Sequence, residues 1–248
     1  MINIFHQDSQ AFLEAQKVMY DLIYIDPPYN TRKTQRLGEN SYDDSIADYK
    51  AFMLNHIFWA HKLLKPTGTM IVQCDWHEAH HIRTWMDTCF GSECFLNEII
   101  WAYDYGARSK KKWSTKHDNI FIYVKDPNNY TFNYEAIERI PYMAPSLVGE
   151  EKAAKGKTLT DVWWHTIVPT NGKERVGYPT QKPLGIIRRF VEVHSNPGDR
   201  CLDFFAGSGT FGVACQEKGR HCDLVDSNPQ AIAIMYNRMP SAIVYDNN

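Results

Sequence analysis

The sequence contains no apolar run of the roughly 18 residues that a membrane-spanning helix requires, so no membrane span is expected. Residues 1–5 lack the basic region and following apolar stretch of a signal peptide. The 6 cysteines include no Cys-x-x-Cys pair, and several lie in apolar segments, which indicates reduced, buried thiols in a cytoplasmic protein. A formal net charge of −2 argues against a general nucleic-acid coat, but it is compatible with a local basic patch.

The composition, 44% apolar and 23% charged over 248 residues, is that of a globular protein with one large domain or one domain with an insert. Strand and helix patterns alternate along residues 1–125 and again along 181–248, which predicts an α/β fold with a mainly parallel sheet and helices on both faces. Residues 126–180 lose this periodicity, and we interpret them as an insert. Strands are expected at 2–5, 21–25, 69–74, 97–103, 119–125, 200–204 and 221–225, and helices at 9–19, 48–64, 77–89, 182–195, 210–218 and 230–239.

The tetrapeptide Asp26-Pro27-Pro28-Tyr29 follows an apolar run at residues 22–25, where a buried strand is expected to end. Two prolines restrict φ and remove two backbone donors, so the chain leaves the strand rigidly. The Asp26 carboxylate and the nearby carbonyls then form a group of acceptors beside the ring of Tyr29. Such a group suits a planar substrate with an exocyclic NH2 group, although a strand that simply ends in a Pro-Pro turn explains these four residues equally well.

A second motif, DFFAGSGTFG at residues 203–212, lies where a strand is expected to turn into a helix. Glycines there permit positive φ and a close approach of a ligand to the backbone. The next expected strand ends at Asp226, placed to accept hydrogen bonds from ribose hydroxyls. The spacing matches G-x-G-x-x-G, so an NAD-dependent dehydrogenase must be considered. The motif begins only about 40 residues before the end of the sequence, which leaves no second mononucleotide-binding half after it and argues against NAD.

Together these motifs resemble the hallmarks of the DNA amino-methyltransferases, which transfer a methyl group from S-adenosylmethionine to an exocyclic base nitrogen. Residues 26–29 match the D/N/S-P-P-Y/F/W tetrapeptide, and FAGSG at 205–209 matches F-x-G-x-G. The tetrapeptide comes first, which is the order of the permuted β group. Three further segments match: Asp8 after the first strand, YPTQKP at 178–183, and LKPTG at 64–68, in which Thr67 replaces the first glycine of the usual LKPGG.

The resemblance covers about residues 2–125 and 176–240 and implies a Rossmann-like, circularly permuted sheet of seven strands. One strand of the pair 97–103 and 119–125 should be antiparallel, and residues 126–180 should form a small target-recognition insert. S-adenosylmethionine should lie across the strand ends, with its methionine part at the glycine turn. The cofactor-binding residues implied in this way are Asp8, Gln181, Lys182, Asp203, Phe205, Gly207, Ser208, Gly209, Thr210 and Asp226.

The resemblance assigns catalysis to Asp26, Pro27, Pro28 and Tyr29. The lone pair of an exocyclic amine is delocalised into the ring, and acceptance of its two N–H groups by Asp26 and the Pro27 carbonyl would turn the nitrogen toward the methyl group. Double-stranded DNA is the implied substrate, with the target base flipped out and stacked on Tyr29. Asp at the first tetrapeptide position inclines the prediction toward adenine N6. The alternatives are methylation of cytosine N4, more remotely methylation of adenine in RNA, and a catalytically silent DNA-binding subunit. The absence of Pro-Cys argues against methylation of cytosine at carbon 5.

Basic residues are grouped in two polar segments. Cationic side chains of this kind bind phosphates and supply affinity and salt dependence rather than sequence choice. A solvated surface loop is the alternative, but the expected closeness to the tetrapeptide favours DNA binding. The sequence does not reveal whether the chain forms a homodimer, as is common in the β group, or works with a restriction nuclease. The predicted DNA-binding residues are Arg32, Lys33, Arg36, Arg108, Lys110, Lys111, Lys112 and Trp113.

Residues 77–81, HEAHH, formally match H-E-x-x-H, which places two imidazoles on one helix face for zinc. No third ligand follows at a recognisable spacing, and the related enzymes have an ordinary helix here, so no metal site is expected. The apolar stripe on the helix at 48–64 is expected to pack in the core. The adjacent Trp163 and Trp164 are equally compatible with base reading and with packing of the insert.

Overall fold

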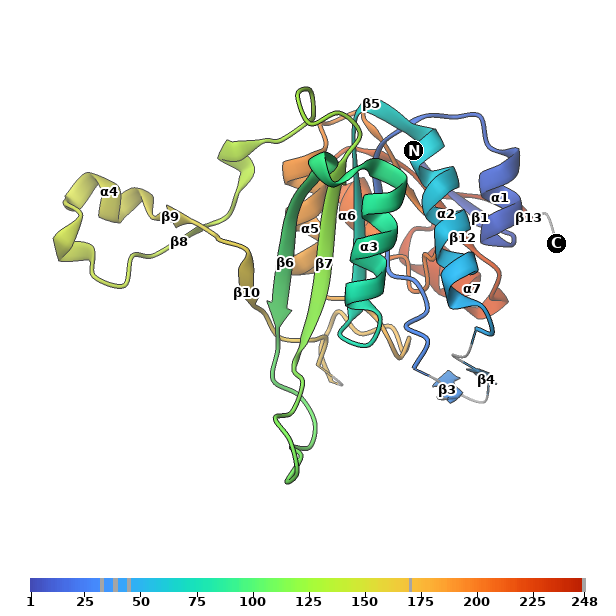
Figure 1. Cartoon of the computed structure of the whole chain (residues 1–248), viewed down its shortest axis with the longest axis horizontal. Coiled ribbons are helices and arrows are strands. Elements are labelled where there is room, and N and C mark those ends of the chain that lie inside the picture. The colour runs from blue at the N-terminus through green and yellow to red at the C-terminus, as the bar shows by residue number, and fades with distance from the viewer. Residues whose placement is uncertain (32–33, 38–39, 44–45, 170, 247–248) are drawn as a thin grey trace.

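The computed structural model describes residues 1–31, 34–37, 40–43, 46–169 and 171–246 (Figure 1). Nine strands of these segments form one sheet, in which strands from the two ends of the chain lie side by side. In spatial order they are β10 (Val162–Trp164), β6 (Phe95–Ala102), β7 (His117–Val124), β5 (Leu64–Asp75), β2 (Tyr20–Ile25), β11 (Arg200–Asp203), β12 (His221–Asp226), β1 (Ile2–His6) and β13 (Ile243–Asp246).

The sheet is mostly parallel, as the sequence predicts. Only β7 runs antiparallel to its neighbours β5 and β6. The predicted number of seven strands is wrong, because one extra parallel strand lies at each edge: β10 pairs with β6, and β13 pairs with β1. Both are short, at 3 and 4 residues, and β13 is exposed along its whole length, so each falls below the length of the apolar runs that predicted the other strands.

Helices cover both faces of the sheet. On one face lie α1 (Ser9–Ala15), α2 (Tyr49–Leu63) and α3 (Ala79–Phe90), and on the other lie α5 (Leu184–His194), α6 (Thr210–Glu217) and α7 (Pro229–Arg238). Strand β2 shows why two cores form: Leu22 and Tyr24 pack into one, whereas Ile23 and Ile25 pack into the other. Successive side chains of a strand point to opposite faces, so a central strand with an unbroken apolar run must be buried on both sides.

Several predicted boundaries differ from the structure. Strand β5 begins at Leu64, directly after α2, rather than at the predicted residue 69, and Leu64 pairs with Tyr20. The register between β2 and β5 shifts after this pair. Between β2 and α2, where no strand was predicted, β3 (Thr34–Leu37) and β4 (Asn40–Asp43) form an antiparallel hairpin. A short 3-10 helix, η1 (Ser92–Cys94), joins α3 to β6.

Residues 126–161 form an arm that projects from the sheet beyond β6 (Figure 1). The arm contains η2 (Tyr134–Ala136), β8 (Arg139–Ile140), η3 (Pro145–Leu147), α4 (Glu150–Lys155) and β9 (Lys157–Thr158), and β8 pairs with β9. After the arm the chain returns to the sheet as β10. The segment predicted as an insert therefore combines an extended arm with one strand of the central sheet. No helix among the described segments is long and apolar enough to cross a membrane.

Candidate active site

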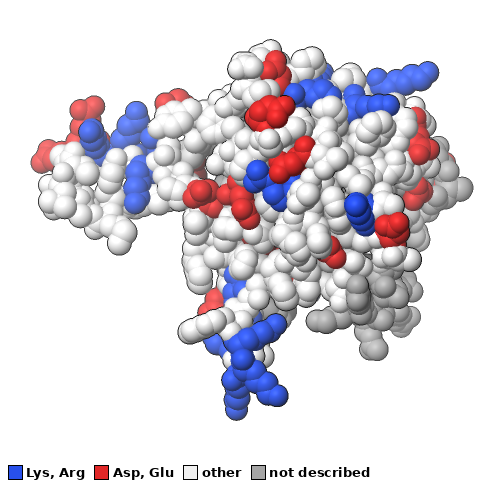
Figure 2. Space-filling view, in the orientation of Figure 1, with Lys and Arg blue, Asp and Glu red and all other residues white. Residues whose placement is uncertain are grey.

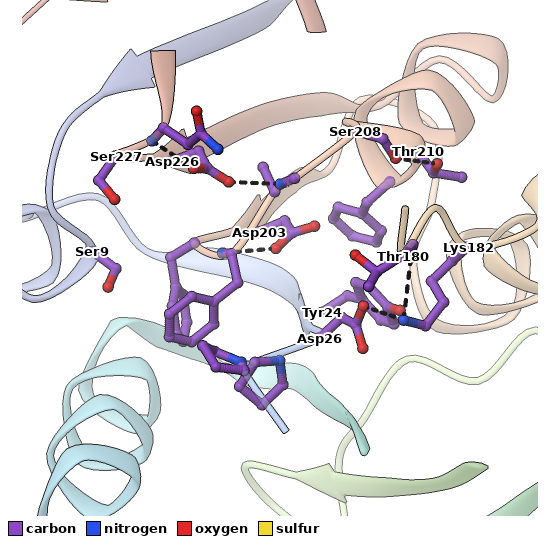
Figure 3. Close-up of a pocket in the computed structure, with 18 of the residues that line it drawn as sticks. Ser9, Tyr24, Asp26, Thr180, Lys182, Asp203, Ser208, Thr210, Asp226 and Ser227 are labelled. Carbon is purple, nitrogen blue, oxygen red and sulfur yellow. Dashed lines mark hydrogen bonds and ion pairs between the residues drawn. The ribbon is translucent and has the colours of Figure 1, made fainter. Parts of the chain in front are cut away.

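A cavity of about 420 Å³ lies at the edge of the sheet where β2, β11, β12 and β1 end (Figure 3). These four strands are adjacent and parallel, so their carboxyl ends meet at one edge, where ligands bind in open α/β sheets. All four residues of the tetrapeptide line the cavity, as do most of the predicted cofactor-binding residues: Asp8, Lys182, Asp203, Phe205, Gly207, Ser208, Thr210 and Asp226.

Asp26 follows the last residue of β2, and both of its carboxylate oxygens have partners. Oδ1 accepts a 2.6 Å hydrogen bond from the hydroxyl of Tyr29, and Oδ2 forms an ion pair with Nζ of Lys182. Burial raises the pKa of Asp26, and the neighbouring Lys182 cation opposes that rise. The arrangement holds a largely buried carboxylate, a strong hydrogen-bond acceptor, against one wall of the cavity.

The Tyr29 ring is held by partners on other strands. Its hydroxyl lies 3.2 Å from Oδ2 of Asp118 on β7, in addition to its bond to Asp26. Asp118 also accepts hydrogen bonds from Nε2 of Gln73 at 2.8 Å and from the hydroxyl of Tyr103 at 2.9 Å. Sequence reasoning missed this network, because its members belong to β5, β6 and β7 and come together only through strand pairing.

The proline corner is anchored as well. The hydroxyl of Tyr49, at the start of α2, donates a 2.7 Å hydrogen bond to the carbonyl of Pro28. The Pro28 carbonyl therefore has a partner within the protein, which favours Pro27 as the carbonyl that accepts from a substrate.

The glycine turn packs closely against its neighbours. Gly207 has φ +50°, and its N–H donates a 2.8 Å hydrogen bond to Oδ2 of Asp226 at the end of β12. A Cβ atom at Gly207 would lie 3.1 Å from Cε1 of Tyr178, and one at Gly209, with φ +72°, would lie 2.6 Å from Cγ of Met235. Glycine is required at both positions by backbone conformation and by space.

Two further carboxylates surround the glycine turn. Asp203, at the end of β11, is buried and accepts a 3.0 Å hydrogen bond from the N–H of Phe205; burial raises its pKa. Asp226 accepts from the N–H groups of Gly207 and Asn228, each at 2.8 Å, and burial raises its pKa too. A carboxylate can accept about four hydrogen bonds, so Asp226 retains capacity for ligand hydroxyls.

Asp8 lies on the neighbouring strand end, two residues after β1. Its Oδ1 caps α1 by accepting a 2.9 Å hydrogen bond from the N–H of Ala11. The pairing of His6 with Asp226 brings the end of β1 beside the end of β12, so Asp8 and Asp226 line the same cavity.

Two predicted cofactor-binding residues are not among those that line the cavity. Gly209 lies behind the turn, against Met235. Gln181 is buried and ties a nearby segment together, since its Nε2 donates to the carbonyl of Glu174 and its Oε1 accepts from the N–H of Val176. The structure thus gives the Gln181 amide partners within the protein.

Several cavity residues were not expected from the sequence. Tyr24 precedes the tetrapeptide on β2, and its ring stacks on Phe211 with centroids 5.3 Å apart. Tyr178 and Thr180 belong to the YPTQKP segment, which carried a signal for them. The other unexpected lining residues are Ser9, Ile46, Phe52, Ile187, Phe204, Ala206, Ser227 and Asn228.

The H-E-x-x-H residues do not share one arrangement. His77 precedes α3, and its Nδ1 lies 2.6 Å from Oδ2 of Asp75. His81 lies on α3 and stacks on Trp85. The two imidazoles of the motif therefore have separate partners, and this segment shows none of the geometry that the motif predicts.

The predicted basic loop joins β6 to β7 and extends away from the sheet. Figure 2 shows Lys and Arg side chains gathered at this protrusion, in the lower part of the view. Arg108, the three lysines at 110–112 and Trp113 are exposed, and Nζ of Lys112 lies 5.2 Å from the ring centroid of Trp76 at the end of β5. Of the other predicted DNA-binding residues, Arg32 and Lys33 lie outside the described residues, and Arg36 belongs to β3.

Comparison with known proteins matches residues 20–237 to the N6/N4 methylase family, described as DNA methylases. The chain is 30% identical over 234 residues to the type II methyltransferase M.HpaI of Haemophilus parainfluenzae, which covers 94% of this chain and 72% of that protein. It is 32% identical over 259 residues to the DNA adenine methyltransferase YhdJ of Escherichia coli (strain K12), which covers 98% of this chain and 84% of that protein.

Solved structures share the fold at lower identity. The crystal structure of the M1.HpyAVI–SAM complex superimposes with a TM-score of 0.69 at 22% identity, over 96% of this chain and 99% of that one. The cytosine-N4-specific PvuII DNA methyltransferase has a TM-score of 0.69 at 15% identity, over 100% of this chain and 87% of that one.

The cavity, with its proline corner at one end and its glycine turn at the other, is that of a DNA amino-methyltransferase. The chain belongs to the N6/N4 DNA methylase family. This family uses S-adenosylmethionine, which is therefore the cofactor of this enzyme. The residues present fit that molecule: Gly207 leaves the space that a Cβ would fill, and the carboxylates of Asp226 and Asp8 offer acceptors for hydroxyl and amino groups.

Proposed function

We propose that the enzyme methylates the exocyclic N6 amine of adenine in double-stranded DNA, by direct displacement on a base flipped out of the helix. One observation carries the proposal: a single cavity joins the Asp26 carboxylate and the Tyr29 ring to the glycine turn. An Asp at the first tetrapeptide position and the 32% identity to a DNA adenine methyltransferase support adenine as the target.

Asp26 would act on the target amine as a fixed acceptor. The lone pair of an exocyclic amine is delocalised into the ring, and hydrogen bonds from its N–H groups to Asp26 and to the Pro27 carbonyl would draw the nitrogen out of conjugation. Positive charge then develops on the nitrogen beside a carboxylate already in position, which is electrostatic preorganisation. Asp26 is also placed to accept the proton that the methylated amine releases.

Tyr29 would hold the base that Asp26 polarises. Extrusion of a base from the duplex costs a few kcal/mol, and stacking on an aromatic ring offsets part of that cost. The hydrogen bonds from Tyr29 to Asp26 and Asp118 keep the ring in one orientation, so the base meets a prepared surface.

The cofactor would be held by the strand ends on the other side of the cavity. The backbone at Gly207 and Ser208 would contact its methionine part, Asp226 its ribose and Asp8 its adenine. When bound, S-adenosylmethionine supplies an electrophilic methyl group. Alignment of that group with the amine by the protein contributes up to about 7–11 kcal/mol in well-oriented reactions.

The loop between β6 and β7 would bind the DNA backbone beside the cavity. It begins just after Tyr103 and ends just before Asp118, and both residues belong to the network that holds Tyr29. The exposed cations of the loop therefore extend from the base-binding corner itself, where phosphate contacts would orient the duplex.

Labelled methyl transfer tests the proposal. The purified protein is incubated with double-stranded DNA and S-adenosylmethionine that carries a labelled methyl group, and the product nucleosides are separated by mass spectrometry. We expect N6-methyladenine, and we expect Asp26→Ala to abolish transfer while it retains cofactor affinity. N4-methylcytosine would assign the enzyme to cytosine instead, since both bases present an NH2 beside a ring nitrogen. Near-normal turnover by Asp26→Ala would refute the role of Asp26.

A further inference from the structure

Lys182 contacts both surfaces that the proposed function assigns to the target base. Its Nζ pairs with Oδ2 of Asp26 (Figure 3), and the same atom lies 5.2 Å from the ring centroid of Tyr29. The remaining oxygen of Asp26, Oδ1, already accepts from the Tyr29 hydroxyl. In this structure, therefore, the ammonium of Lys182 already contacts both the Asp26 carboxylate, which would accept the amine, and the Tyr29 ring, which would stack on the base.

We propose that Lys182 is a positioning residue that holds the base pocket: it keeps Asp26 ionised and covers Tyr29 until the amine of the target base displaces it. The inference rests on the proposed function in one respect: that function identifies the group that displaces Lys182 as the amine of the target base. The pairing of Lys182 with Asp26 does not depend on that function.

The charges around Asp26 explain why it needs this partner. A buried carboxylate is costly unless an opposite charge and hydrogen bonds compensate for the lost water. The groups that face it from β11 and β7 are acidic, and a second carboxylate nearby further opposes its ionisation. Among the described residues, Lys182 is the cation that acts on Asp26. The titratable groups that influence or are influenced by Asp26 are Lys182, Tyr24, Tyr29, Cys74, Tyr103, Asp118 and Asp203.

The position of Lys182 in the chain allows it to leave. It lies two residues before α5 begins, and its four-carbon stem permits the ammonium to move without a shift of the helix. The carbonyl of Thr180 lies 3.4 Å from Nζ and offers another acceptor. A base without an exocyclic amine brings no NH2 group to Asp26 and so competes less well with the ammonium of Lys182, which adds selectivity for amino bases.

The first test needs no catalytic activity. Protein labelled with ¹³C at aspartate carboxyl carbons is titrated by NMR, with the Asp26 signal assigned through Asp26→Asn. We expect Asp26 of Lys182→Met to take up its proton at higher pH than in the wild type. Lys65→Met is the matched control, because it removes the 2.8 Å ion pair with Asp21 at the opposite end of the same strand β2. An Asp26 titration that is the same in Lys182→Met and the wild type would overturn the inference.

The second test separates pocket holding from cofactor binding. We expect the kcat/KM of Lys182→Met for DNA to be about tenfold or more below the wild type at pH 6 and to come closer to it at pH 9, because a buried carboxylate without its cation needs a higher pH to ionise. Lys182→Arg should restore activity at pH 6, since it restores the charge. At pH 9 the KM of Lys182→Met for DNA should not exceed that of the wild type, because no ammonium group competes with the base for Asp26 and Tyr29. A higher KM for the cofactor at every pH, with an unchanged pH profile, would contradict the inference.

Together the two tests distinguish a failure of the proposed function from a failure of the inference about Lys182. A wild-type protein that transfers no methyl group to any DNA would remove the proposed function, and the NMR titration would still decide whether Lys182 controls the ionisation of Asp26. An active wild type with an unshifted titration in Lys182→Met would leave the function standing and remove the inference.

Discussion

Oδ2 of Asp118 lies 3.2 Å from the hydroxyl of Tyr29, although 89 positions separate the two residues. The same hydroxyl donates a 2.6 Å hydrogen bond to Asp26, so the ring is fixed between two carboxylates on different strands. A ring held in this way presents a constant face to a flipped base. This relationship gives Tyr29 two separable roles, one for its ring and one for its hydroxyl.

Substitutions of Tyr29 should separate these roles. Tyr29→Phe keeps the ring but loses the single hydroxyl proton and its hydrogen bond to a charged partner, worth about 1.5–3 kcal/mol, and we expect kcat to fall by roughly tenfold to a hundredfold. Tyr29→Ala also loses the stacking surface and should be worse, whereas Tyr29→Trp should be milder than Tyr29→Ala. Steady-state kinetics on duplex DNA measure all three variants. Equal losses in Tyr29→Trp and Tyr29→Ala would remove the stacking role.

A methyl group at the glycine turn should weaken cofactor binding. Gly207→Ala places Cβ 3.1 Å from the Tyr178 ring and adds the strain of a positive φ, which costs about 1–2 kcal/mol in a non-glycine residue. Gly219→Ala is the matched control, because Gly219 also has positive φ (+73°) but has nothing within 4 Å of its Cβ position. Calorimetry should show at least about tenfold weaker S-adenosylmethionine binding in Gly207→Ala only. Equal affinities in the two variants would show that the contact with Tyr178 is irrelevant.

Replacement of Lys110, Lys111 and Lys112 by Ala should weaken DNA binding at every sequence. Each phosphate contact contributes to the salt dependence of the association constant, so the slope of its logarithm against the logarithm of salt concentration should become shallower by up to about 2–3. The control replaces Lys17, Lys62 and Lys218, which change the net charge equally but lie just before the starts of β2, β5 and β12, at the edge of the sheet opposite the cavity. Fluorescence anisotropy at several salt concentrations measures both. A slope as steep as in the wild type would show that the loop faces away from DNA.

His194, at the end of α5, should make folding stability fall with acid. It is buried, and burial lowers its pKa to about 4, whereas an unfolded chain takes up the proton near pH 6.5. Because the folded pKa is the lower one, the unfolded state binds the proton first. The stability is thus fully present above pH 6.5 and is lost as the pH falls toward 4, by about 3 kcal/mol in all.

Urea unfolding at pH 7 and pH 4.5 can measure this contribution. We expect His194→Leu to lose less stability than the wild type between these two values, because it has no imidazole to protonate on unfolding. The same loss in both proteins would show that His194 is not the source of the acid sensitivity.

The predicted strand and helix pattern was largely confirmed because the elements near the cavity are strongly apolar. The run at β2 is buried on both faces, and a buried parallel strand has few other interpretations. The edge strands β10 and β13 escaped prediction because they are only 3 and 4 residues long, too short for their apolar residues to show an alternating pattern. The predicted start of a strand at residue 69 was wrong, since pairing with β2 extends β5 back to Leu64.

The residues of the site also divide into those that the sequence reveals and those that only the structure reveals. The tetrapeptide and the glycine turn could be recognised as sequence because each works through local backbone: two prolines in one case, two positive-φ glycines in the other. Asp118, Gln73 and Tyr103 carry no such local signal. Their importance comes from hydrogen bonds to one another and to Tyr29 across three strands.

By itself, the sequence determined the class of fold, the two ends of the cavity and the chemistry that each end offers, because strand endings, prolines and glycines act over a few residues. Only the tertiary structure decided that the Lys182 ammonium would meet the Asp26 carboxylate, 156 positions away, and that Tyr29 would be held from β7. The physical reason is that parallel strands bring their carboxyl ends to one edge in an order set by topology, and side-chain partners across that edge follow from strand register.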